Sequence, residues 1–154
     1  MRIRILWEGK TKDPHLRAMQ EDLAGRIKHF IPLTLEEFPA LRTPHEVRQE
    51  GLTAAEGKLL EKLRGVKKIL LDESGRERTS QEFADWLGKA AVAGSRDLAF
   101  LIGGPDGFSA VFRAQADTVM ALSRMTLTRD WARTLLLEQV YRAFTILRGF
   151  PYSR

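Results

Sequence analysis

Asp97-Leu98-Ala99-Phe100-Leu101-Ile102 runs directly into the turn Gly103-Gly104-Pro105-Asp106-Gly107. The five residues after Asp97 are all apolar, with no alternation between apolar and polar positions. A β-strand that is covered on both faces of its sheet has this pattern. We therefore expect a central strand over 98–102 that ends in a glycine-rich turn.

Four more segments read as strands, and helical segments separate them. The strand-like segments lie at 2–7, 31–36, 66–71 and 118–122, and a turn is expected at 72–75. The helical segments lie at about 14–30, 52–63, 80–93, a short stretch from 109, and 131–147. Parallel neighbours need crossover connections, so this order predicts an α/β fold: a mostly parallel sheet with helices on both faces.

Length and composition bound the class of protein. The chain has 154 residues, of which 44% are apolar and 29% charged, as in an ordinary globular protein, so we expect one domain over 1–154. No apolar run is long enough to span a membrane and the start does not resemble a signal peptide, which indicates a cytoplasmic protein with no membrane partner. The absence of cysteine excludes disulfides, thiolate zinc sites and cysteine nucleophiles. The three histidines lack ligand spacing, so no metal is expected.

The charge favours an anionic partner. The net charge is +5 and the pI about 9.8. From Arg124 to the end, all six basic residues are arginine and only two residues are acidic. The planar guanidinium of arginine matches phosphate in two-point contacts and stacks on bases. RNA binding is one interpretation, and a solvated basic face without a partner is the other.

The ends of three strands are the places to look for a ligand site. In open parallel sheets ligands bind beyond the carboxyl ends of the strands, here after Leu71, Ile102 and Leu122. The turn 103–107 lets a ligand approach the backbone, but it matches neither phosphate-binding glycine motif, and a plain tight turn is the alternative. The segment 122–127 is too apolar for a free loop. Either a flat apolar ligand such as adenine covers it, or its side chains fill the core.

The last helix is apolar around more than one face. Its large apolar residues are Trp131, Leu135, Leu136, Leu137, Val140, Tyr141, Phe144 and Leu147. This pattern predicts a second protein surface, hence a homodimer, with a helix sunk in its own core as the alternative. Glu138 and Arg142 stand four residues apart and can form an ion pair that orients the arginine.

Two motifs in this region resemble the RlmH family of the SPOUT superfamily of methyltransferases. They are Ile102-Gly103-Gly104-Pro105-Asp106-Gly107 and Glu138-Gln139-x-Tyr141-Arg142-Ala143, and the resemblance extends over nearly the whole chain, including Pro151-Tyr152. It implies a C-terminal trefoil knot over about 98–154, an exception to the rule that folds are unknotted. It also implies a homodimer.

The resemblance further implies an enzyme that transfers a methyl group from S-adenosyl-L-methionine to N(3) of a pseudouridine in 23S rRNA, on the ribosome. The residues it assigns to cofactor binding are Leu71, Gly103, Leu122, Ser123, Arg124, Met125, Thr126 and Leu127. Arg142 is implied as a catalytic residue that stabilises negative charge on the base, and Tyr152 as one that closes the site.

Two positions depart from the family pattern. Members commonly carry histidine before the last helix and after the tail tyrosine, where this chain has Arg129 and Ser153. The general base is therefore unassigned. The alternative function is a SPOUT-like RNA-binding protein with an altered substrate or without methyltransferase activity.

Overall fold

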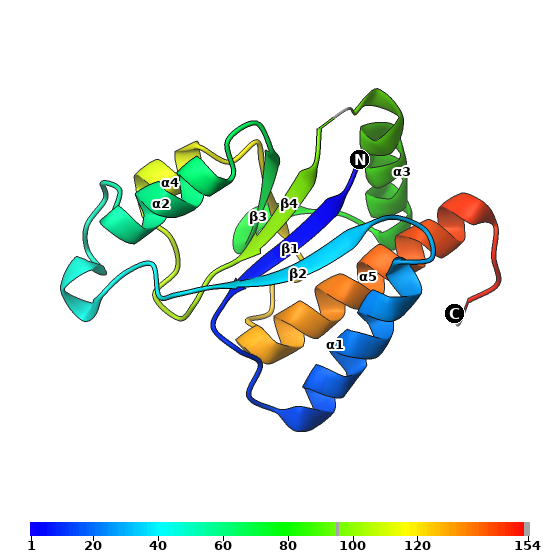
Figure 1. The fold of residues 1–154 in the computed structure, drawn as a ribbon, viewed down its shortest axis with the longest axis horizontal. Helices are drawn as coiled ribbons and strands as arrows, with labels where there is room; N and C mark the ends of the chain where they lie inside the picture. Colours follow the sequence, from blue (N-terminus) through cyan, green and yellow to red (C-terminus); the bar gives the residue numbers. More distant parts are fainter. Residues whose placement is uncertain (95, 153–154) are drawn as a thin grey trace.

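A computed structural model describes residues 1–94 and 96–152 and contains one sheet of five parallel strands (Figure 1). The strands are β1 (Ile3–Glu8), β2 (Leu33–Phe38), β3 (Lys67–Glu77), β4 (Leu98–Ile102) and β5 (Thr118–Ala121), in the order β2-β1-β4-β3-β5. All five residues of β4 are buried in the middle of the sheet. The predicted central strand and the parallel sheet are both confirmed.

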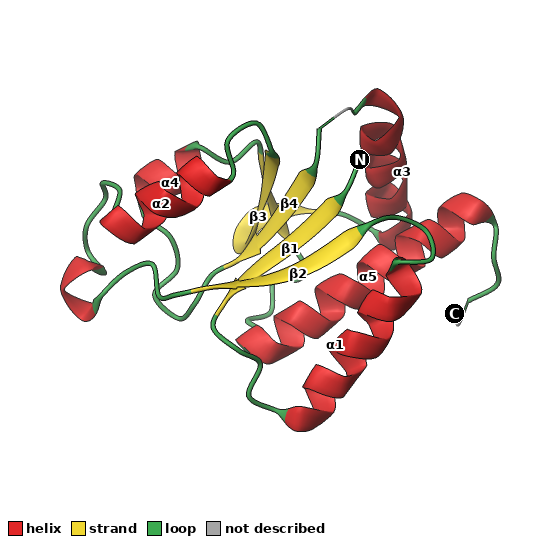
Figure 2. Cartoon of the chain, in the orientation of Figure 1, coloured by secondary structure: helices red, strands yellow, loops and turns green. Residues whose placement is uncertain are grey.

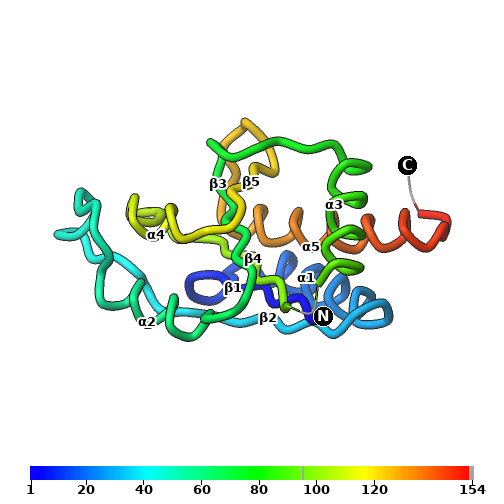
Figure 3. Tube along the Cα trace, turned by 90° about the horizontal axis from the view of Figure 1, so that it is seen from above, coloured from blue at the N-terminus to red at the C-terminus, as the bar shows by residue number. Residues whose placement is uncertain are grey.

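Helices cover both faces of the sheet, as predicted (Figures 2 and 3). One face carries α1 (Pro14–Ile27), α3 (Ser80–Ala93) and α5 (Arg129–Arg148); the other carries α2 (Ala54–Lys62) and α4 (Ala110–Ala114), with the 3₁₀ turn η1 (Pro44–Glu46) in the loop before α2. Successive β4 residues alternate between the two cores: Phe100 packs with the first group and Leu101 with the second. None of the described helices is long and apolar enough to cross a membrane.

Side-chain caps fix where the helices begin. The Asp13 carboxylate accepts hydrogen bonds from the backbone N–H groups of the first turn of α1, and Thr79 forms a capping box with Glu82 at the start of α3. Thr128 caps α5, so this helix begins at Arg129, two residues before the predicted start. The earlier start places Arg129 on the first turn of α5.

The alternation of polar and apolar residues at the start of the chain suggests that β1 has one solvated face, but the structure shows otherwise. Arg4 is 8% exposed, and its guanidinium donates two hydrogen bonds of 2.8 Å to the Glu36 carboxylate on β2. Because helices cover both faces of this sheet, the polar alternation of β1 marks a mostly buried ion pair and not a solvated face.

The structure also corrects the turn predicted at 72–75, because β3 runs through it to Glu77. The register of β3 against β5 shifts between Leu71 and Arg76, so the intervening residues form an irregularity inside the strand. Gly75 makes this possible, since a Cβ there would lie 2.7 Å from the backbone of β5. The single domain and the trefoil knot over about 98–154 stay predictions.

Candidate functional site

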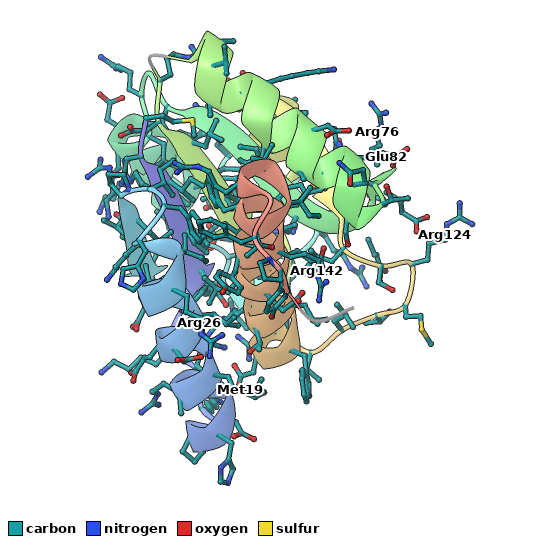
Figure 4. All side chains as sticks on the ribbon, turned by 90° about the vertical axis from the view of Figure 1, so that its right-hand side faces the viewer. Met19, Arg26, Arg76, Glu82, Arg124 and Arg142 are labelled. Atoms are coloured by element: carbon teal, nitrogen blue, oxygen red, sulfur yellow. The ribbon has the colours of Figure 1, made fainter. Side chains whose placement is uncertain are left out.

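A cavity of about 370 Å³ lies at the carboxyl ends of β4 and β5, where β3 becomes irregular after Leu71, and beside the first turns of α5. Its lining residues are Leu71, Asp72, Glu73, Ile102, Gly103, Gly104, Pro105, Gly107, Phe108, Leu122, Ser123, Met125, Thr126, Leu127, Arg129 and Ala132. Seven of the eight residues assigned to cofactor binding are among them. The eighth, Arg124, is not; its side chain is 87% exposed and projects outward from the loop before α5 (Figure 4).

The glycine turn after β4 forms one side of this cavity, and its first two glycines are closely packed against other side chains. A Cβ on Gly103 would lie 2.8 Å from the Phe108 ring, and one on Gly104 would lie 1.7 Å from Oε2 of Glu8. Gly107 has a φ of 65°, which favours glycine. Glycine is therefore favoured at 103 and 104 by the packing of Phe108 and Glu8, and at 107 by the backbone conformation; all three glycines line the cavity with main-chain atoms.

Residues 123–127 form the opposite side of the cavity, and we call them the wall. Met125 is 78% exposed, so it does not fill the core as the alternative interpretation of this segment required. Leu122, just before the wall, packs against the main core, and Leu127 is half-buried. The apolar residues of segment 122–127 therefore line a concave surface that remains open.

Charged groups surround the cavity in fixed pairs. Burial raises the pKa of Asp72, but hydrogen bonds from Ser74 and Arg113 outweigh it, so the pKa lies below its usual value and the carboxylate is charged. Arg129 lies 3.7 Å from Oε2 of Glu8. Glu8 in turn accepts a hydrogen bond of 3.2 Å from the Leu41 backbone N–H. The cavity thus combines apolar walls with anchored polar groups.

Arg142 and Tyr152 lie together near the other end of α5. The Arg142 guanidinium donates to Oε1 of Glu138 at 2.6 Å, which confirms the predicted ion pair, and its carbon lies 4.7 Å from the centre of the Tyr152 ring. The Tyr152 ring also meets the Tyr141 ring edge-on at 4.9 Å. Burial, with the nearby Glu138 carboxylate, raises the pKa of the Tyr152 phenol, which is therefore neutral at physiological pH. Arg142 is an oriented cation.

Within one chain, these two residues do not meet the cavity. The last residue of α5 that lines the cavity is Ala132, and Arg142 comes ten positions after it, which is about 15 Å along a helix that rises 1.5 Å per residue. An arginine side chain cannot span that distance. The structure therefore groups the cofactor-binding candidates in one place and the catalytic candidates in another, while Ser153 lies outside the described residues.

Sequence reasoning missed three anchored residues of the site. Asp72 and Glu73 directly follow Leu71, the last residue of the strand predicted at 66–71, and that position was the signal that could have identified them. Nothing in the sequence around Glu8 indicates that it lies near the site. Its carboxylate reaches Gly104 only because β1 and β4 pair in parallel, with Trp7 opposite Ile102.

Comparisons with known proteins agree with this fold and cavity. The sequence profile of the family described as "Predicted SPOUT methyltransferase" matches residues 1–153, so the class is that of the SPOUT methyltransferases. Proteins named "Ribosomal RNA large subunit methyltransferase H" are 42% identical in Geobacter metallireducens, 43% in Geobacter sulfurreducens and 37% in Bacteroides fragilis. Each match covers 99% of this chain and 98–99% of the relative. The chain therefore belongs to the family of ribosomal RNA large subunit methyltransferase H.

Solved structures share the fold at low sequence identity. A probable methylase family protein from Haemophilus influenzae has a TM-score of 0.56 at 13% identity and covers 99% of this chain and 70% of its own. A probable methyltransferase from Bordetella pertussis has a TM-score of 0.55 at 16% identity and covers 92% of this chain and 95% of its own.

The cofactor of SPOUT methyltransferases is S-adenosyl-L-methionine. The residues present fit it, because the cavity combines main-chain approach at Gly103 and Gly104 with apolar side chains at Leu71, Leu122 and Leu127. An adenosyl group needs both kinds of surface: backbone polar groups for its edge and apolar groups for its faces.

Proposed function

We propose that this protein methylates large-subunit ribosomal RNA with S-adenosylmethionine as the donor, and that its target is N(3) of a pseudouridine in 23S rRNA on the ribosome. The observation that supports this proposal most directly is the cavity beside β3, β4 and β5, because seven of the residues assigned to the cofactor line it. Relatives that match over the full chain carry the name of this activity. Its place of action is the cytoplasm, where ribosomes are.

The residues that would hold the cofactor are Leu71, Gly103, Leu122, Ser123 and 125–127, with Arg124 at the outer edge of the wall. When bound, S-adenosylmethionine supplies an electrophilic methyl group on its sulfonium. The chain's contribution is to hold the two reactants in line and to exclude water, which converts a bimolecular reaction into an intramolecular one.

Arg142 has the chemistry to stabilise the negative charge that develops on the base carbonyls as N(3) loses its proton. Glu138 fixes the guanidinium in place, and Tyr152 packs on it as a neutral ring. Because Arg142 lies about 15 Å along α5 from Ala132 in its own chain, we assign it to the cavity of a second copy.

A homodimer supplies that second copy. Large apolar side chains on and near α1 and α5 remain exposed: Met19 by 49%, Trp131 by 49%, Leu147 by 41% and Phe150 by 56%. An isologous interface that pairs two α5 helices in antiparallel fashion sets the Arg142 end of one opposite the Arg129 end of the other. The same pairing covers exposed apolar surface on both copies.

Two measurements test the proposal. Calorimetric titration of S-adenosylmethionine into the protein is expected to show saturable binding. Mass spectrometry of 23S rRNA from a strain that lacks the gene is expected to show one pseudouridine without its methyl group, restored by the gene on a plasmid. Binding without any change in the RNA favours the altered-substrate or RNA-binding alternative, and no heat at millimolar ligand contradicts the enzyme.

A further inference from the structure

Two segments that face each other across the cavity are joined by side chains. One is the end of β3, residues 72–77, which we call the rim; the other is the wall, residues 123–127. The Thr126 hydroxyl donates a hydrogen bond of 2.9 Å to Oε2 of Glu73, and both residues line the cavity. Farther out, Arg124 pairs with Glu77.

Contacts with α4 and β5, and not with the wall, hold the rim in place. Arg113 on α4 donates to the Asp72 carboxylate at 2.5 Å and to the Ser74 hydroxyl at 2.8 Å. At Gly75 the rim lies so close to β5 that a Cβ would meet the Met120 backbone nitrogen at 2.7 Å. The rim is therefore a fixed frame that does not depend on the position of the wall.

The middle of the wall has few contacts other than those to the rim, while Leu127 at its end is half-buried. The Ser123 hydroxyl accepts a hydrogen bond of 2.9 Å from the Met125 backbone N–H, which shapes the loop locally. Arg124 is 87% exposed along its side chain and Met125 is 78% exposed, so neither anchors the loop by burial. At the cavity itself, the Thr126–Glu73 hydrogen bond is therefore the contact that joins the wall to the rim.

We propose that Glu73 is a positioning residue for cofactor binding, which acts through Thr126 to hold the wall at the separation that the adenosyl group requires. This inference rests on the proposed function, because it assumes that the cavity binds S-adenosylmethionine. Glu73 organises the cavity before the ligand arrives, so less ordering remains to be done on binding.

Both links between wall and rim are exposed, but only the residues of the Thr126–Glu73 link line the cavity. The Arg124–Glu77 pair is an exposed ion pair at the outer edge, 87% and 45% accessible, and pairs of this kind contribute little. The Thr126–Glu73 hydrogen bond borders the cavity itself and is covered once a ligand lies against it. Glu77 therefore provides a matched control: the same residue type on the same rim, joined to the same wall.

The test measures the dissociation constant of S-adenosylhomocysteine by calorimetry and the midpoint of thermal unfolding without ligand. We expect Glu73→Ala and Thr126→Val each to weaken binding by roughly 3- to 10-fold, the range set by the loss of one hydrogen bond. The double variant is expected to bind no more weakly than either single variant, because both remove the same bond. The unfolding midpoint is expected to stay within about 1 °C of wild type.

Conservative variants and the control complete the test. Glu73→Gln keeps an acceptor and Thr126→Ser keeps the hydroxyl, so both are expected to bind as wild type does, and so is Glu77→Ala. Wild-type affinity in Glu73→Ala, or additive losses in the double variant, overturns the positioning role. Failure of the wild-type protein to bind the ligand overturns the proposed function instead, so the two failures are distinguishable.

Discussion

The two ends of α5 border different groups of candidate functional residues. At its first turns, Arg129 and Ala132 border a cavity whose remaining sides come from three strand ends. Toward its last turns, Arg142 is held by Glu138 and packs on Tyr152, about 15 Å along the helix beyond Ala132. In the proposed function, each end supplies one half of a methyl transfer. The comparison teaches that a cavity and an oriented charge this far apart on one helix can belong to one active site only if a second copy brings them together.

The largest expected effect is on the charge at the C-terminal end. Arg142→Ala removes the group proposed to stabilise the developing anion, so methyl transfer to ribosomes is expected to fall by about 10²- to 10³-fold. The dissociation constant for S-adenosylmethionine is expected to stay unchanged, because the proposed role of Arg142 is toward the RNA base and not toward the cofactor. Transfer is measured with a radiolabelled methyl group and binding by calorimetry.

Arg148 is the matched control for this substitution. It is an exposed arginine on the last turn of α5, with its guanidinium carbon 5.9 Å from the Phe30 ring centre. Arg148→Ala is expected to transfer methyl groups at the wild-type rate. If Arg142→Ala also transfers methyl groups at the wild-type rate, Arg142 has no part in the reaction, and the C-terminal end of α5 has no catalytic role.

Mixing two inactive variants tests whether the ends of α5 cooperate across copies. Ser123→Trp places an indole in the cavity but keeps Arg142, and Arg142→Ala keeps the cavity. Equal amounts, unfolded and refolded together, give a population in which half the dimers are mixed, and each mixed dimer has one intact composite site. Activity is expected to return to about a quarter of wild type.

An active site formed within a single chain gives a different result in this mixing experiment. If Arg142 serves the cavity of its own chain, no subunit in the mixture holds both halves, and activity stays at the level of the separate variants. Analytical ultracentrifugation of each variant is the control, since both must still form dimers. A monomeric wild-type protein contradicts the composite site directly.

The cavity was predictable because its signals are local. The unbroken apolar run of β4, the glycines after it and the apolar segment 122–127 each follow from short-range sequence. Glu8 was not predictable, because its carboxylate reaches Gly104 through the register of two strands about ninety residues apart. Met19 belongs to the apolar series of α1 yet is 49% exposed, since helical periodicity does not say how wide the covered face is.

The separation of Arg142 from the cavity was also beyond the sequence. The Glu138–Arg142 pair follows from its spacing, and the structure confirms it. The resemblance assigned both Arg142 and the wall to one reaction, but a sequence gives no distance between them. That distance depends on α5 running straight for 20 residues from Arg129 to Arg148.

The smallest expected effect on methyl transfer comes from a residue remote from both ends of α5. The Glu36 carboxylate accepts hydrogen bonds from Arg4 and Thr34, and these bonds, led by that of Arg4, lower its pKa to about 2. A carboxylate whose pKa is lower in the folded than in the unfolded state stabilises the fold above its unfolded pKa, near 4.5. That contribution declines as the pH falls from about 4.5 toward 2.

Glu36→Gln is therefore expected to lower the free energy of unfolding at pH 7 by up to about 3 kcal/mol, the equivalent of the pKa shift. The difference from wild type is expected to shrink below pH 4.5 and to vanish near pH 2, as measured by urea unfolding across that range. Asp22→Asn breaks an exposed pair with Arg26 and is expected to leave stability nearly unchanged. At 25 °C and pH 7 the Glu36→Gln enzyme is expected to transfer methyl groups at the wild-type rate, because its folded fraction remains high and neither end of α5 is altered. A loss of transfer without a loss of folded protein would instead connect β1 and β2 to the site.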